Sequence, residues 1–315
     1  FGDVQVSGQK RQTWVIASAY AKDVQLTIPQ IGSTFYFSDS IFLDSTAIRI
    51  PKVTLYDKEG HQGTFNGIIS HTNFKDFHYD LHANVNNLLA LDLPYTAQSL
   101  FYGKVYGSGS IHIKGNDDEC KIMVDARTEA NTKFYLSVNT ASEASNSSFV
   151  QFTQPSSSNN LLHLLSSPPP QNKTKLAKRT KLQLSLQIEA TPTAEINIKL
   201  GGDDGIRGRG EGNLKITYDD SSEEVQMLGT YTLQSGKFSY ALGNIVRRKF
   251  DIAEGSYVVW DGDPLSPTVD ITGRYHTTAS LRDLFGSEFS QAATNRTSVP
   301  VNCVLHMTDK LFNPI

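Results

Sequence analysis

Apolar and polar residues alternate with a period of two along most of the chain. In residues 181–189 every even-numbered position is apolar and every odd-numbered position is polar, which places the apolar side chains on one face of a strand. The same alternation recurs in residues 194–200, 214–218, 238–242, 269–275 and 299–307. Each run predicts a half-buried strand of about five to nine residues.

Clusters of Gly, Asp and Asn separate these runs, as in residues 115–118, 201–205 and 219–222. Such clusters are typical of tight turns, so we expect a long antiparallel meander. Further glycines lie close to or within the runs, for example Gly107 and Gly236. Glycines in strands mark bulges and bends, and they predict a strongly curved sheet.

Helical patterns are few. Residues 86–92 and 278–285 could each form a short helical turn, but neither is long enough to cover a sheet of this size. A strand with one apolar face needs a second apolar layer. The sequence therefore predicts an all-β sheet that closes, folds over or holds a ligand.

Residues 139–180 interrupt the pattern and are rich in Ser, Asn and Pro. This composition is typical of a flexible insertion. We therefore divide the chain into a first part of the β-sheet (1–138), the insertion (139–180) and a carboxy-terminal β-domain (181–315).

The net charge and the lengths of the apolar stretches limit which partners the sequence predicts. The chain has 29 Lys+Arg and 32 Asp+Glu, a net charge of -3, so no electrostatic pattern favours nucleic acid. No stretch approaches the roughly 20 apolar residues of a membrane-spanning helix. The chain begins at Phe1 with no signal-peptide pattern, and we expect it to be part of a longer protein.

The sequence contains few residue patterns that are typical of a catalytic or metal-binding site. His78, Asp80 and His82 share one face of a predicted strand, but no second group of ligands is evident, so we expect no metal. Acidic pairs such as Asp117 and Asp118 fall in turns, where Asp caps the backbone. No nucleophile elbow or phosphate loop occurs, and we expect neither an enzyme nor a cofactor.

The two cysteines, Cys120 and Cys303, fall on the apolar phase of their runs. We expect buried free thiols. A mutual disulfide is open, because spacing alone does not determine pairing.

A distinctive series of phrases lies in the second half of the chain: GRGEGNL at 208–214, GTYTLQSGKFSY at 229–240, FDIAEGSYVVWDGDP at 250–264 and VDITGRY at 269–275. Looser matches lie upstream at 53–60, 67–71 and 101–109. The chain resembles the carboxy-terminal domain of the TamB family, the translocation and assembly module of Gram-negative envelopes, in its Bacteroides-like form. The resemblance covers most of the chain outside residues 139–180.

The resemblance implies a periplasmic, taco-like or U-shaped β-trough with an apolar interior. It implies an inner-membrane anchor, a helix upstream of this chain, and an outer-membrane TamA-type barrel protein as partner. It further implies movement of phospholipid between the two membranes and support of outer-membrane biogenesis, without catalytic residues. The alternative is a scaffold or chaperone that assembles outer-membrane proteins without conducting lipid.

Strand phase selects the residues that would line an apolar groove for lipid. Phase shows which side chains point together, and it leaves open whether their face is an open groove or a closed core. The predicted lining residues are Leu182, Leu184, Leu186, Ile188, Ile196, Ile198, Leu214, Ile216, Phe238, Tyr240, Phe250, Ile252, Val269 and Ile271.

Overall fold

The computed structural model describes residues 2–9, 12–96, 99, 101–137, 180–201, 204–222, 224–242, 246–280 and 298–311. Every regular element in these ranges is a strand of one 17-stranded sheet, and no helix there could span a membrane. The predicted all-β class is confirmed. The strands are β1 (Gly2–Gln9), β2 (Gln12–Ile28), β3 (Ser33–Leu43), β4 (Ala47–Asp57), β5 (Gln62–Thr72), β6 (Lys75–Leu93), β7 (Phe101–Asn116), β8 (Glu119–Thr128), β9 (Lys133–Ser137), β10 (Lys181–Ala190), β11 (Glu195–Gly201), β12 (Asp204–Asp219), β13 (Glu224–Leu242), β14 (Val246–Ile252), β15 (Tyr257–Gly262), β16 (Thr268–Ser280) and β17 (Ser298–Lys310).

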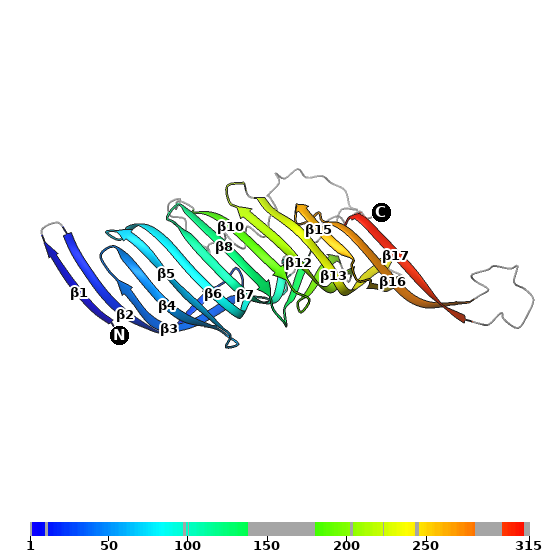
Figure 1. The fold of residues 1–315 in the computed structure, drawn as a ribbon, viewed down its shortest axis with the longest axis horizontal. Helices are drawn as coiled ribbons and strands as arrows, with labels where there is room; N and C mark the ends of the chain where they lie inside the picture. Colours follow the sequence, from blue (N-terminus) through cyan, green and yellow to red (C-terminus); the bar gives the residue numbers. More distant parts are fainter. Residues whose placement is uncertain are drawn as a thin grey trace, which may run out of the picture.

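Most strands pair antiparallel with the next one along the chain. This holds from β1 through β8, for β12 with β13, and for β15 through β17. The strands lie side by side along the long axis of the molecule (Figure 1). The meander predicted from the turn clusters is confirmed.

The strands are longer than the sequence pattern predicted. Both β6 and β13 contain 19 residues, whereas the alternating runs indicated about five to nine. The prediction was wrong because bulges let a strand continue through a break in its alternation. Register shifts of this kind occur in β6 between Val85 and Leu88, and in β13 at Gln234, which has no partner between Arg209 and Gly210 of β12.

The sheet departs from a purely antiparallel pattern at one junction. Strand β10 runs parallel to β8, and β11 runs parallel to β9. Parallel neighbours need a crossover of a dozen or more residues, and the chain between Ser137 and Lys181 supplies that length. The sheet therefore continues from one side of the predicted insertion to the other.

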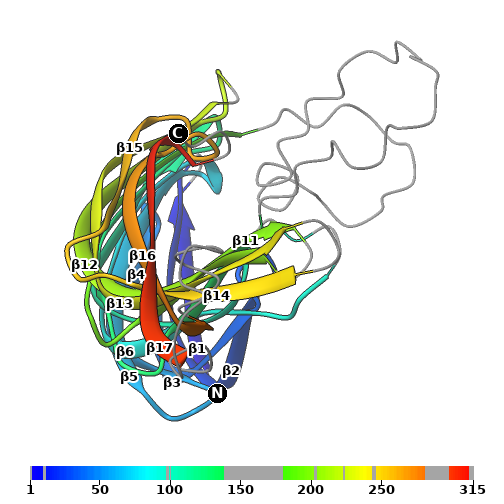
Figure 2. The ribbon, with the colours of Figure 1, turned by 90° about the vertical axis from the view of Figure 1, so that its right-hand side faces the viewer.

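A line of bends crosses the sheet from β6 to β16, and we call it the crease. It passes through two connecting segments, which we call corners: residues 129–132 between β8 and β9, and residues 191–194 between β10 and β11. Hydrogen bonds join successive bends: Glu195 N donates to Thr132 O, and Leu233 N donates to Ser256 O. Figure 2, viewed along the trough, shows β11 and β14 turned away from the main wall. In cross-section the sheet is therefore a U-shaped trough, as the sequence resemblance implied.

Glycine permits the bend in β12. A Cβ atom on Gly210 would lie 2.0 Å from Thr232 O of the neighbouring strand, far inside van der Waals contact. On β7 at the same crease, Gly103 has φ of 116° and leaves no room for a side chain, because a Cβ atom would lie 2.1 Å from Lys133 O. The glycines therefore mark the bend, as the sequence predicted.

The main hydrophobic core lies at the carboxy-terminal end. It combines buried residues of β10 to β17, among them Ile198, Trp260 and Ile271. At the other end of the crease, Leu88, Leu89 and Tyr106 are also buried. Buried side chains therefore stabilise the trough at both ends of the crease.

The helical turn predicted at residues 86–92 is wrong, because this segment belongs to β6. Asn87 takes a left-handed conformation with φ of 50°, and the bulge there puts the consecutive Leu88 and Leu89 both inside. Two consecutive inward-facing leucines interrupt the period of two, and the resulting spacing resembles that of a helix. In the second predicted turn, residues 278–280 belong to β16, and residues 281–285 lie outside the described ranges.

Both cysteines are free. Cys120 is half-buried, but Cys303 is exposed, contrary to the prediction. Strand β17 pairs with β16 alone among the described strands, and Val304 beside Cys303 is 64% exposed. Among the described strands, none therefore covers this part of β17.

Candidate functional site

The cross-strand registers align apolar side chains of the middle strands in continuous rows. One row runs Ala83, Ile111, Val124, Leu186, Ile216 and Met227, each directly opposite the next, from β6 to β13. A second row runs Leu81, Ile113, Ile122 and Leu184. We call these two rows, with their neighbours Leu182, Ile188 and Leu214, the apolar band.

Every residue of the apolar band is half-buried, neither sealed nor fully exposed. Strand β10 packs against its hydrogen-bonded neighbours β8 and β12, and no other described strand lies over it in substantial contact. The side chains on β10 therefore shelter one another without a second layer of described strands, whereas Leu214 and Met227 of the band pack against the main hydrophobic core.

The opposite face of the same strands is mostly polar, although Met123 of β8 and Leu228 of β13 are exposed there. On β10 it carries Gln183, Ser185, Gln187 and Glu189, which alternate with the leucines and isoleucine of the band. Because successive residues of a strand point to opposite faces, the two sides of the wall differ in chemistry. At β10 the wall is apolar on its inner face and polar on its outer face.

The predicted lining residues separate into two environments, which phase alone could not distinguish. Five of them are buried in the carboxy-terminal core: Ile198, Phe238, Ile252, Val269 and Ile271. Ile196, Leu214 and Phe250 pack against that core. Five others are half-buried and lie outside this core: Leu182, Leu184, Leu186, Ile188 and Ile216. The structure does not describe the side chain of Tyr240.

The crease produces this separation. It turns β11 and β14 across the trough (Figure 2), and their Ile198 and Ile252 join one cluster with Val258 and Trp260 of β15. The Trp260 ring is fixed further, because its Nε1 donates to the Pro264 carbonyl at 3.1 Å. The carboxy-terminal end is therefore a closed core, and toward the middle the lining continues as half-buried side chains on β10, over which no other described strand packs.

An ion pair between the buried Glu195 and the exposed Arg207 supports the closed end. The Glu195 carboxylate accepts a hydrogen bond from the Arg207 guanidinium at 2.8 Å and one from the Asn197 amide at 3.3 Å. Burial opposes ionisation of Glu195, but these hydrogen bonds outweigh burial and hold its pKa below the ordinary value. Glu195 is thus a structural anion at the corner that begins β11.

Asp57 has a similar structural role in the amino-terminal half. Its buried carboxylate accepts hydrogen bonds from the backbone N–H groups of Leu89 and Glu59, both at 2.8 Å, and lies 2.9 Å from His61 Nδ1. Burial alone would raise the pKa of Asp57, but these hydrogen bonds lower it below its usual range. Asp57 joins the turn after β4 to β6.

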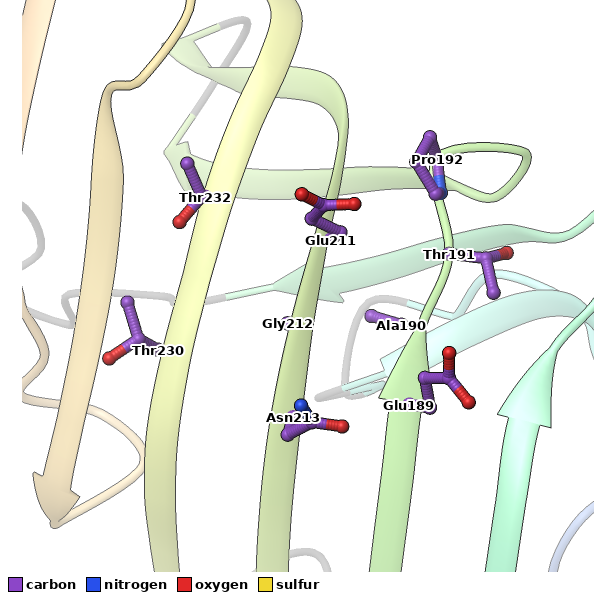
Figure 3. A pocket seen from close by; sticks show the side chains of 9 residues that line it. All are labelled: Glu189, Ala190, Thr191, Pro192, Glu211, Gly212, Asn213, Thr230 and Thr232. Atoms are coloured by element: carbon purple, nitrogen blue, oxygen red, sulfur yellow. The ribbon is translucent and has the colours of Figure 1, made fainter.

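The polar face carries an open pocket of about 450 Å³ beside the crease (Figure 3). Its lining comes from β10, β12 and β13 and includes Glu189, Asn213 and Thr230. Glu189 and Asn213 alternate with Ile188 and Leu214 of the apolar band. The pocket therefore lies on the other side of the sheet and is separate from the trough interior.

The acidic pairs were predicted to lie in turns, and the structure bears this out for Asp117, Asp118 and Asp263, whereas Asp261 belongs to β15 and Asp204 to β12. In the turn after β15, Asp263 Oδ1 accepts a hydrogen bond from Leu265 N at 2.8 Å, which is the capping role predicted from sequence. Asp118 N donates to Asn116 Oδ1 in the turn after β7. Asp203 lies outside the described ranges.

The histidine face contains a ligand group that sequence reasoning missed. His112 of β7 lies directly opposite His82 of β6, so Asp80, His82 and His112 form one cluster. His78 is not part of it, and its Nδ1 lies 3.1 Å from the Asp76 carbonyl. His112 belongs to another strand, and only the register between β6 and β7 brings it to this place.

Comparison with known families agrees with this geometry. The model of the TamB C-terminal domain matches residues 53–314, which includes the whole apolar band and the closed core. No curated protein matches the chain. The chain therefore belongs to the TamB C-terminal domain family, whose members act in the TamB module of envelope biogenesis.

Proposed function

We propose that the apolar band holds phospholipid acyl chains and that the trough moves lipid between the inner and outer membranes. The observation that carries this proposal is the row of half-buried apolar side chains across six neighbouring strands, whose strand β10 has no described strand in substantial contact other than its hydrogen-bonded neighbours β8 and β12. Lipid tails would supply an apolar layer that the described strands do not place over β10.

The dimensions of the band suit lipid tails. Neighbouring strands lie about 4.8 Å apart, so six strands span roughly 24 Å. The tails of one membrane leaflet occupy about half of a hydrocarbon core of roughly 30 Å. One row is therefore longer than a tail in its leaflet, and each buried methylene contributes about 0.8 kcal/mol.

Family membership supports the setting of the proposal. The TamB family belongs to the periplasmic envelope and associates with an outer-membrane TamA-type partner. Its components transport or assemble and do not catalyse. We extend this to the chain as a conduit that receives phospholipid on the inner-membrane side and releases it toward the outer membrane.

The test is mass spectrometry of organic extracts from chain purified without detergent, with an unrelated protein from the same cells as background. We expect near-stoichiometric phospholipid from the natural chain. Leu186→Asp places a charge in the middle of the apolar band and should remove the lipid. Gln187→Asp is the matched control, because it places the same charge one residue away on the polar face.

Circular dichroism must show that both variants retain β-structure. Equal lipid in Leu186→Asp and Gln187→Asp, or a stable natural chain without lipid, would contradict the proposal and favour an assembly scaffold. Ile198→Arg is unsuitable for this test, because Ile198 is only 6% exposed within the closed core. A charge there should unfold the carboxy-terminal end.

A further inference from the structure

Three potential metal ligands converge on the outer face of the trough. His82 of β6 and His112 of β7 occupy opposed register positions, and their rings stack with centroids 4.1 Å apart. Asp80 lies two residues before His82 and therefore on the same face. Its Oδ1 is 2.9 Å from His82 Nε2 and 2.8 Å from His112 Nε2.

We propose that Asp80, His82 and His112 bind a divalent transition-metal ion of the Zn²⁺ type. Their ligand atoms all lie within 4.8 Å of one another. A tetrahedral Zn²⁺ ion with bonds of about 2.0–2.1 Å needs ligand atoms roughly 3.3 Å apart. In the present arrangement both imidazole rings lie at hydrogen-bond distance from Asp80 Oδ1, and binding would require the stacked rings to turn until both Nε2 atoms face the ion.

The donor set and its support fit such an ion. Imidazole nitrogen suits Zn²⁺, Cu²⁺ and Ni²⁺, and a carboxylate completes a three-ligand face. All three side chains are part-exposed, at 47% for Asp80, 49% for His82 and 31% for His112. An ion can enter from solvent, and water can occupy the fourth position. The ligands stand on paired strands, which hold them in place better than a loop.

One positive charge opposes the ion. Lys114 of β7 lies directly opposite Asp80, and its charge acts on the Asp80 carboxyl. A cation bound beside Asp80 would be repelled by this ammonium group. The site is therefore weaker than its ligands alone would make it, and removal of Lys114 should strengthen it.

A bound ion would join β6 to β7 from outside. His82 lies between Leu81 and Ala83, whose side chains form part of the apolar band on the inner face. The metal would thus brace the wall behind the band. This inference depends on neither lipid binding nor transport.

The experiment is calorimetric titration of the full, untagged chain with Zn²⁺, followed by Co²⁺ absorption spectroscopy. We expect one ion per chain and Co²⁺ bands of a tetrahedral nitrogen and oxygen site. His112→Asn should lower the affinity by at least about tenfold. Lys114→Gln should raise it several-fold.

The matched control is His306→Asn. His306 Nε2 also lies 2.8 Å from a carboxylate, Asp270 Oδ1, but no second histidine joins that pair among the described metal-ligand groups. Unchanged affinity in this variant supports the proposal. Equal loss in His306→Asn and His112→Asn, or no binding by the natural chain below millimolar Zn²⁺, overturns it. Circular dichroism without metal shows that each variant is folded.

Discussion

The middle of the trough and its carboxy-terminal end use the same alternating sequence pattern but bury it differently. Leu184 and Leu186 in the middle are half-buried, whereas Val269 and Ile271 at the end are 1% and 0% exposed. The difference comes from the crease, which brings β11 and β14 into contact with the cluster of β15 to β17. Alternation therefore determines which side chains share a face, and the bend determines whether that face is covered.

Truncation of equivalent apolar side chains should separate the two regions most strongly. Ile271→Ala should lower the free energy of unfolding by about 2–5 kcal/mol, because it opens a cavity in a sealed core. Leu186→Ala should cost roughly 1 kcal/mol or less, since Leu186 has little packing to lose. Chemical denaturation followed by circular dichroism measures both.

Equal losses in these two variants would contradict the distinction between an open and a closed region. The comparison should be made on lipid-free chain. Bound lipid would add packing around Leu186 and would stabilise the natural chain by mass action.

Substitution at the crease should have the next largest effect. Gly210→Ala places a methyl group 2.0 Å from Thr232 O, and relief of the overlap should cost about 1–3 kcal/mol. Gly107→Ala is the control, because its Cβ would meet only Arg127 O at 3.5 Å. Thermal unfolding of both variants measures the difference. Equal tolerance of the two would show that β12 does not need glycine to bend.

Acid should weaken the closed end through Glu195, with the smallest effect of the three. The folded pKa of Glu195 is lower than its unfolded pKa. Its stabilisation is therefore present above the unfolded value, roughly 4.3, and is lost as the pH falls through the folded value. We expect less than about 1 kcal/mol, because Arg207 is 66% exposed and solvent screens the pair.

Glu195→Gln isolates this contribution. The variant should be less stable than the natural chain at pH 7, and the difference should shrink between pH 5 and pH 3. Thermal unfolding across that range measures it. A difference that is constant with pH would show that the Glu195 charge does not support the closed end.

Much of the fold followed from local pattern. The phase of residues 181–189 placed Leu184 and Leu186 on one face, and the glycines around 208–212 marked the bend that the structure shows. These features depend on neighbours along the chain. Local sequence therefore carries them.

Features that depend on other strands could not be predicted. His112 meets His82 only through the register of β6 with β7. Coverage of Ile198 depends on the path of β11 across the trough, and burial of both Leu88 and Leu89 depends on a bulge. The division of the chain at residues 139–180 stays a prediction, as does the inner-membrane anchor implied by the resemblance.

The junction between β8 and β10 has a consequence for the order of folding. From β1 to β8, each strand can pair as soon as the next emerges, because its partner is its neighbour in the chain. Strand β10 instead meets β8 across the segment between Ser137 and Lys181. Closing so long a loop costs entropy before contacts repay it, so the two sides of the sheet can form first and dock later. The apolar band crosses this junction and becomes continuous only at that docking step.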